Sequence, residues 1–168
     1  MNKDLERTFL NALEESQEKL FRICFSYATN PEETKDLFQE VLIHIWKAMP
    51  NFKGDASLST WMYRITLNVA LRYRSNLQRA KNRISQIGSI TIEQIGEHQE
   101  ESESRHKLDL LRQCVRSLNE IDKAVITLYL EELPYKEIGT VLGLKENTVA
   151  VRVKRIKKKL LNCLNEKL

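Results

Sequence analysis

The sequence is poor in the residues that interrupt helices. It holds five glycines and three prolines among 168 residues, and it is rich in Leu, Glu, Lys and Arg. Glycine and proline disfavour a helix interior most strongly, whereas long unbranched side chains disfavour it least. The composition therefore predicts an all-α protein rather than one built on sheets. This length suits one medium domain or two small ones.

Cysteine is scarce, and long apolar runs are missing. The three cysteines, Cys24, Cys114 and Cys163, are far apart and form no C-x-x-C pair, which argues against a zinc ribbon or a disulfide framework. Each lies in a helical apolar pattern, so we expect small core residues in a reducing cytosol. With no secretory signal and no run near the length of a membrane span, we expect a cytoplasmic protein without membrane insertion.

Charge is unevenly distributed along the chain, although the net charge is only +4. Basic residues concentrate in 72–83 and in 145–159, whereas 93–103 carries five Glu and no Lys or Arg. Two separate basic stretches indicate two contacts with a polyanion such as nucleic acid. Solvated helix faces would explain either stretch taken alone.

The last fifty residues predict two short helices around a tight turn at Gly143, the second of them heavily basic. This is the layout of a helix-turn-helix whose second helix enters the DNA major groove. An apolar stripe at helical spacing predicts the buried face of that helix: Val149, Val153, Ile156, Leu160 and Leu164. On the opposite face Val151 suits a thymine methyl group and Arg155 suits guanine.

The first eighty residues predict three helices: Phe9 to Tyr27, a segment capped by Asn30 that runs to about Met49, and Leu58 to about Leu77. The third carries aromatic residues among Arg and Asn, a mixture that suits unstacked bases and phosphates and equally suits an ordinary core: Trp61, Tyr63, Arg64, Asn68, Arg72 and Tyr73. From Gln78 to about Arg105 we expect a flexible tether. Two more helices are indicated by apolar spacing: Leu108, Leu111, Val115 and Leu118, then Ile121, Val125 and Leu128.

Several of these motifs together resemble the bacterial RNA polymerase sigma factors, and most of all their extracytoplasmic-function (ECF) subfamily. The stretches 36–41, 52–55 and 60–68 are similar to sigma region 2, and 118–160 is similar to sigma region 4. The resemblance implies two small helical domains joined by a flexible linker: a region 2 bundle at 5–78, a linker at 79–105 and a region 4 helix-turn-helix at 106–168. It implies no catalytic residue, metal or cofactor.

The resemblance also implies partners and site residues. The partners are core RNA polymerase (β′ clamp helices and β flap), promoter DNA and an anti-sigma factor. Polymerase-binding positions are Asp36, Gln39, Glu40 and Ile43. Residues for the −10 element are Phe52, Lys53, Gly54, Asp55, Ala56, Ser57, Trp61, Arg64, Asn68 and Arg72. Residues for the −35 element are Lys145, Asn147, Thr148, Ala150, Val151, Arg152, Lys154, Arg155 and Lys158.

The sequence leaves two alternatives open. One is a dimeric helix-turn-helix regulator that binds duplex DNA without core polymerase. The other is metal or acid–base chemistry through Asp36, Glu40 and His44, which are spaced i, i+4, i+8 on one helix face. No second predicted helix carries His and carboxylates that could complete a site with this triplet, so the metal or acid–base alternative is the weaker of the two. Lys145, Asn147 and Val151 depart from residues common in the family, so the −35 sequence is not predicted.

Overall fold

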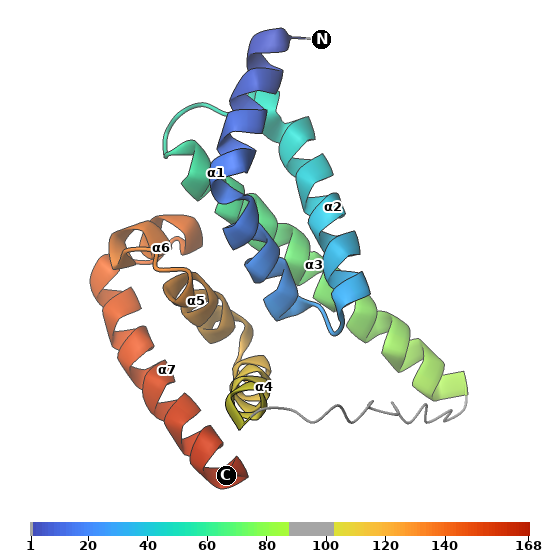
Figure 1. Cartoon of the computed structure of the whole chain (residues 1–168), viewed down its shortest axis with the longest axis vertical. Helices are drawn as coiled ribbons and strands as arrows, with labels where there is room; N and C mark the ends of the chain where they lie inside the picture. The colour runs from blue at the N-terminus through green and yellow to red at the C-terminus, as the bar shows by residue number, and fades with distance from the viewer. Residues whose placement is uncertain (1, 88–102) are drawn as a thin grey trace.

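The computed structural model describes residues 2–87 and 103–168, and in 84–87 it describes the backbone only. The described segments are helical throughout, with short turns between helices (Figure 1). The first group comprises α1 (Lys3–Tyr27), α2 (Pro31–Ala48), a short 3-10 turn at Met49–Asn51, and α3 (Leu58–Ile87). The second group comprises α4 (Glu103–Arg116), α5 (Glu120–Leu130), α6 (Tyr135–Leu142) and α7 (Glu146–Lys167). The predicted all-α fold class is confirmed.

Helix starts follow the expected capping chemistry. The Asn30 side chain accepts a hydrogen bond from the Glu33 amide at 2.8 Å, and the Glu33 carboxylate accepts one from the Thr29 amide at 3.0 Å. This reciprocal pair satisfies amides that have no partner within the helix. Ser57 does the same for α3, since its hydroxyl accepts from the Thr60 amide at 3.2 Å.

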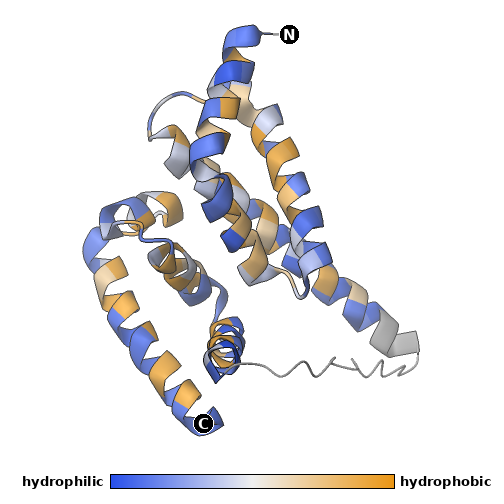
Figure 2. Ribbon diagram, in the orientation of Figure 1, coloured by the Kyte–Doolittle hydropathy of each residue, from blue (hydrophilic) through white to orange (hydrophobic). Residues whose placement is uncertain are grey.

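Apolar residues recur among polar ones along the three helices of the first group (Figure 2). From α2 the buried apolar side chains are Leu37, Val41 and Ile45, and they share one core cluster with buried residues of α1 and α3. The α3 helix extends beyond the expected end near Leu77 and continues to Ile87. The tether expected from Gln78 to Arg105 is therefore wrong at both ends, because 78–87 and 103–105 are helical; its centre lies outside the described residues.

In the second group α5 is the central helix. Every residue from Asp122 to Leu128 is buried, as expected of a helix that is covered on all sides. The predicted stripe of α7 is confirmed for Val149, Val153, Ile156 and Leu160. The expected stripe of α4 is partly wrong: Val115 is buried as expected, but Leu108 is 53% exposed, and the buried face also carries Leu110 and Cys114.

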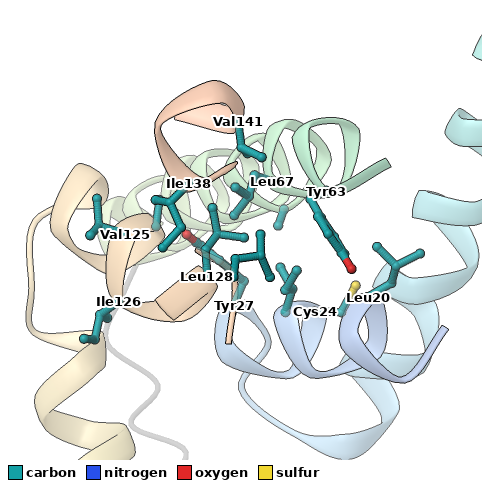
Figure 3. Packing of buried hydrophobic residues seen from close by; sticks show 14 of the residues in the cluster. Leu20, Cys24, Tyr27, Tyr63, Leu67, Val125, Ile126, Leu128, Ile138 and Val141 are labelled. Atoms are coloured by element: carbon teal, nitrogen blue, oxygen red, sulfur yellow. The ribbon is translucent and has the colours of Figure 1, made fainter. Parts of the chain in front are cut away.

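The two groups pack directly against each other. Side chains of α1 and α3, including Tyr27 and Leu67, share one buried apolar cluster with Leu128 of α5 and with Ile138 and Val141 of α6 (Figure 3). Polar contacts lie around this cluster. The Arg22 guanidinium binds both carboxylate oxygens of Glu131 at 2.8–2.9 Å, and Arg116 donates to the Ala28 carbonyl at 3.0 Å.

The expectation that all three cysteines are unpaired core residues is wrong for two of them. Cys114 of α4 and Cys163 of α7 are joined by a disulfide, with Cα atoms 6.0 Å apart and a sequence separation of 49. Sequence spacing gave no indication of this pair, because the two residues meet only when α4 packs along the C-terminal half of α7. Cys24 remains a free, buried thiol in α1.

Candidate nucleic-acid interface

The loop between α2 and α3 borders a cavity of about 240 Å³. Gly54 lies in the left-handed region at φ +78°, a conformation that side chains other than glycine rarely adopt. The sharp turn at Gly54 brings the loop back over the start of α3. The cavity is lined by Asn51, Phe52, Lys53, Asp55, Ala56, Thr60, Trp61, Arg64, Thr140 and Val141.

Two aromatic rings form one wall of this cavity. The centroids of Phe52 and Trp61 are 5.0 Å apart and their planes are inclined by 51°. Trp61 is half-buried, so one part of its ring packs on the core and another part faces the cavity. Tyr63 is different: it is only 4% exposed and belongs to the apolar cluster. The core alternative therefore holds for Tyr63, and Trp61 combines core packing with a cavity surface.

A polar face of α3 leads away from the cavity. Arg64, Asn68 and Arg72 are all exposed. Their spacing of four residues places them on one side of the helix, one turn after another. The face therefore offers a guanidinium at the cavity, then an amide, then a second guanidinium. Such a row can bind phosphates and a base edge along an extended strand.

Helix α6 closes the far side of the same cavity. Thr140 and Val141 contribute to its lining. The Thr60 hydroxyl accepts a hydrogen bond from Ser57 and donates one to the Glu137 carboxylate, both at 2.8 Å. A carboxylate from the second group of helices is thus held at the N-terminal end of α3. A DNA strand that entered the cavity would meet this carboxylate.

The outward face of α2 carries the residues that we expect to bind polymerase. Asp36, Gln39, Glu40 and Ile43 are exposed, and Ile43 is a large apolar side chain with 53% of its surface in solvent. The His44 Nε2 atom lies 3.8 Å from Oε1 of Glu40. Within the described residues no group of three or more His, Cys, Asp or Glu side chains is arranged to hold a metal ion.

The exposed face of α7 is basic with an apolar patch. Val151 is 64% exposed, next to exposed Lys154, Arg155 and Lys158, whereas Ala150 is half-buried. At the N-terminal end Lys145, Asn147 and Thr148 are exposed, and no side chain caps the helix. Open amides and exposed cations at a helix N-terminus favour the binding of an anion.

Arg152 has a different environment from its neighbours. Its guanidinium binds the buried Asp122 carboxylate at 2.9 Å, and Lys159, two turns further along α7, binds the other oxygen at 3.2 Å. Burial alone would raise the pKa of Asp122, but hydrogen bonds from Lys159 and Arg152 outweigh it and leave the pKa below its ordinary value. The charged carboxylate of α5 thus fixes the rotation of α7.

The turn between α6 and α7 depends on two glycines. Gly143 ends α6 in the left-handed conformation at φ +71°. Leu144 then folds back and its amide donates to the Gly139 carbonyl at 2.9 Å. A Cβ atom on Gly139 would lie 2.4 Å from the Leu144 carbonyl oxygen, so only glycine allows this close approach.

The roles of Asp122, Glu137 and the Arg22–Glu131 pair were not predicted from the sequence. For Asp122 a signal was present: Asn119 accepts from the Asp122 amide at 2.9 Å, the pattern of a helix cap. For Glu137 and Arg22 there was none, because their partners lie 77 and 109 residues away in sequence.

Comparisons with known proteins agree with this geometry. Residues 12–80 match the family model of sigma-70 region 2, and residues 108–160 match that of sigma-70 region 4. The ECF RNA polymerase sigma-E factor of Escherichia coli K12 is 30% identical over 139 residues, covering 77% of this chain and 73% of the relative. The RNA polymerase sigma-H factor of Pseudomonas aeruginosa is 28% identical, covering 83% of this chain and 77% of the relative.

Two solved structures share the fold. CnrH in complex with the cytosolic domain of CnrY superimposes with a TM-score of 0.71 at 21% identity, covering 97% of this chain and 91% of CnrH. The sigma factor RpoE in complex with the anti-sigma factor NepR from Bartonella quintana gives 0.67 at 20% identity, covering 98% of each chain. Both family models in this order, together with the sigma-E relative over most of its length, show that the chain belongs to the ECF sigma factors of the sigma-70 family.

Proposed function

We propose that this chain binds core RNA polymerase, directs it to specific promoters and promotes strand opening there, without catalysing a reaction itself. The observation that carries the proposal is the physical difference between its two DNA-facing surfaces. One is a cavity with aromatic walls, and the other is an exposed basic helix face. The proposed task requires one site for an unpaired base and one site for duplex DNA.

The cavity of the α2–α3 loop fits a base that has left the duplex. Extrusion of a base costs a few kcal/mol in lost stacking and pairing, so the receiving site must offer a ring or apolar surface in return. Phe52 and Trp61 offer such a surface, and Arg64, Asn68 and Arg72 continue from it as a polar row. We assign the −10 element to this surface, with the remaining loop residues as its rim: Lys53, Gly54, Asp55, Ala56 and Ser57.

The exposed face of α7 fits duplex DNA. Val151 offers an apolar contact for a thymine methyl group, and Arg155 offers the two parallel donors that guanine accepts. Lys154 and Lys158 flank them and suit phosphate. We assign the −35 element to this face, together with Lys145, Asn147, Thr148 and Ala150. Arg152 we assign to holding α7 in place, because its guanidinium is already bound to Asp122.

The exposed face of α2 suits a protein partner. It combines two carboxylates and an amide with the apolar side chain of Ile43, and these residues face away from the rest of the chain. Charged and polar groups around an exposed apolar residue are the usual composition of an interface that forms and dissociates. We assign core polymerase to this face. Transcription initiation would place the chain in the cytoplasm, and no helix among the described residues is long and apolar enough to cross a membrane.

The closed arrangement of the two helix groups bears on how the protein is controlled. Because α6 lines one side of the loop cavity and Glu137 is bound to Thr60, α6 reduces the room that a DNA strand has at this surface. The two solved structures described above each contain a second protein, in one case an anti-sigma factor. We infer an inhibitory protein partner for this chain as well, one that favours the closed arrangement.

A pull-down with bacterial core RNA polymerase tests the proposal. We expect the chain to be retained by the polymerase, and Ile43→Ala with Glu40→Lys to reduce retention at least tenfold. Glu14→Lys, an exposed charge reversal on α1, is the matched control and should leave retention unchanged. No retention of the unaltered chain, with unaided binding to duplex DNA as a dimer, would favour the helix-turn-helix regulator instead.

A further inference from the structure

Two cysteines from different helices meet inside the second group of helices. Cys114 is fully buried in α4, Cys163 is half-buried near the end of α7, and a disulfide joins them. Cys24 offers a contrast within the same chain. It is free, and burial raises the pKa of its thiol to about 12, so it is a poor nucleophile at neutral pH.

The bond joins the DNA-facing helix to the helix that docks on α1. Cys163 lies eight residues after Arg155 on α7. Cys114 lies two residues from each of two α4 side chains that contact α1 or its C-cap: the Arg112 guanidinium is 4.6 Å from the centre of the Phe25 ring, and Arg116 donates to the Ala28 carbonyl at 3.0 Å. A covalent link at Cys114 thus connects the position of α7 to the closed arrangement.

A permanent disulfide is out of place where this protein acts. Initiation of transcription takes place in a compartment whose thiols are kept reduced, and disulfides found there are usually transient or redox-sensing. We propose that Cys114 and Cys163 form a reversible thiol–disulfide site that locks α4 to α7 when oxidised, so that the position of the −35 surface relative to α4, the helix that docks on α1, responds to the thiol redox state. This inference rests on the proposed function in two respects only: that the protein acts in a reducing compartment, and that oxidation affects a DNA-binding surface.

The chemistry needs an oxidant, and we assign a low-molecular-weight disulfide to that role. The Cys163 thiol, the more accessible of the two, loses its proton and attacks one sulfur of that disulfide, which releases one small thiolate. The Cys114 sulfur then displaces the second small thiolate from Cys163 and completes the bond between the helices. In total two protein thiols are oxidised, one small disulfide is reduced to two thiols, and the two protons pass to those products. A small dithiol that attacks Cys163 reverses the sequence.

Oxidation should stabilise one half of the chain selectively. The bond closes a long loop that contains α5, α6 and most of α7, so it restricts the unfolded state of the second group and leaves α2 outside the loop. We expect the melting temperature of the chain to fall by on the order of 10 °C on reduction. Hydrogen exchange in α4 and in the last turns of α7 should accelerate, whereas exchange in α2 should not.

The experiment uses the full chain at a series of ratios of oxidised to reduced glutathione. Thiols that remain are alkylated after unfolding and located by mass spectrometry, and melting is followed in parallel. We expect Cys114 and Cys163 to become protected from alkylation together, within the monomer, while Cys24 stays free. The change should occur at ratios of oxidised to reduced glutathione within the range found in a reducing cytosol. Cys24→Ser should behave like the unaltered chain, and Cys163→Ser should lose both the protection and the melting shift.

Three results would overturn the proposal. They are thiols that stay free at every ratio, a bond that resists excess dithiol in the folded protein, or protection of the pair with no change in melting. Cys163→Ser replaces a half-buried residue, so it tests the pair even if Cys114→Ser fails to fold. These readouts need no polymerase, so failure of the pull-down described above would leave the thiol site intact and would count against the proposed function alone.

Discussion

The Thr60 hydroxyl donates a hydrogen bond to the Glu137 carboxylate at 2.8 Å, and this contact ties the first turn of α3 to α6. It lies at the edge of the cavity that Phe52 and Trp61 line. The Thr60–Glu137 hydrogen bond is therefore present while α6 lies over the edge of the cavity, and it must break if α6 moves away.

Glu137→Ala should uncover the cavity. The lost hydrogen bond contributes about 1 kcal/mol, so amides of the 52–61 segment should exchange with solvent about fivefold faster. Hydrogen exchange of the chain without partners measures this. Glu166→Ala, an exposed carboxylate near the end of α7, is the control and should change nothing in that segment. Equal protection in Glu137→Ala and the unaltered chain would show that this contact does not hold α6 in place.

Asp122→Asn should destabilise the second group of helices. The substitution removes the charge that holds Arg152 and Lys159, and it leaves a partly buried guanidinium without its counter-ion. We expect a loss of about 2–3 kcal/mol in the free energy of unfolding, measured by urea titration. Asp109→Asn removes the exposed pair with Arg112 and should cost less than about 1 kcal/mol. Equal losses in the two variants would contradict the anchoring role.

The same carboxylate predicts an acid limb of stability. The pKa of Asp122 is lowered in the folded protein, so its contribution is fully present above the unfolded pKa of about 4 and is lost as pH falls through the lower folded value. Unfolding free energies measured between pH 6 and pH 3 should fall less steeply for Asp122→Asn than for the unaltered chain. Parallel curves would mean that other carboxylates produce the whole acid limb.

Lys123→Met should stabilise the closed arrangement at neutral pH. Lys123 is 1% exposed and lies over the Tyr27 ring, and burial, then the charges of Arg74 and Arg116, lower its pKa to about 8. Because the folded pKa lies below the unfolded one, stability from this residue rises as pH climbs above 8. Methionine does not titrate, so it removes this pH dependence, and it should raise the free energy of unfolding at pH 7 by on the order of 1–3 kcal/mol.

The comparison of Lys123→Met with the unaltered chain isolates Lys123 from other groups. The pKa values of Cys24 and Tyr27 are raised by burial, so both residues oppose the alkaline gain from about pH 9 upward. They are present in both proteins, and the difference between pH 7 and 9 therefore reports Lys123. A difference that does not change with pH would contradict its titration in this range.

Gly139→Ala should disrupt the helix-turn-helix. The added Cβ would meet the Leu144 carbonyl at 2.4 Å, so the backbone must shift, and we expect a loss of about 2–3 kcal/mol. Gly54→Ala meets open space but keeps φ at +78°, and should cost about 1 kcal/mol. Calorimetry of both variants orders the two effects. A larger loss of stability in Gly54→Ala than in Gly139→Ala would mean that α6 and α7 can move apart with little loss of free energy.

The sequence predicted the parts of this structure that are set by neighbours along the chain. The cap at Asn30, the glycine turn at Gly143 and the buried stripe of α7 follow from spacing and local chemistry, and each was confirmed. The end of α3 was not predicted, because the polar composition after Leu77 is equally compatible with an exposed helix and with a tether.

The contacts between the two groups of helices could not be predicted, because they join residues that are far apart in the sequence. Arg22 and Glu131 read as solvated charges on amphipathic helices, and nothing near either residue indicates that they pair. The Cys114–Cys163 bond likewise needs the packing of α4 on α7 to be known first. The candidate site could be placed on the α2–α3 loop and α7 from sequence, but its cover by α6 could not.

Promoter opening by variants of α3 tests the central claim, that 52–68 opens the strands while α7 holds duplex DNA. Trp61→Ala and Asn68→Ala are compared with Asn76→Ala, an exposed residue on the same helix, each with core polymerase and promoter DNA. We predict that the first two lose permanganate reactivity of unpaired thymines at least tenfold and lose less than threefold in mobility-shift affinity, while Asn76→Ala retains both. Equal loss of opening and of binding in Trp61→Ala and Asn68→Ala would contradict the account.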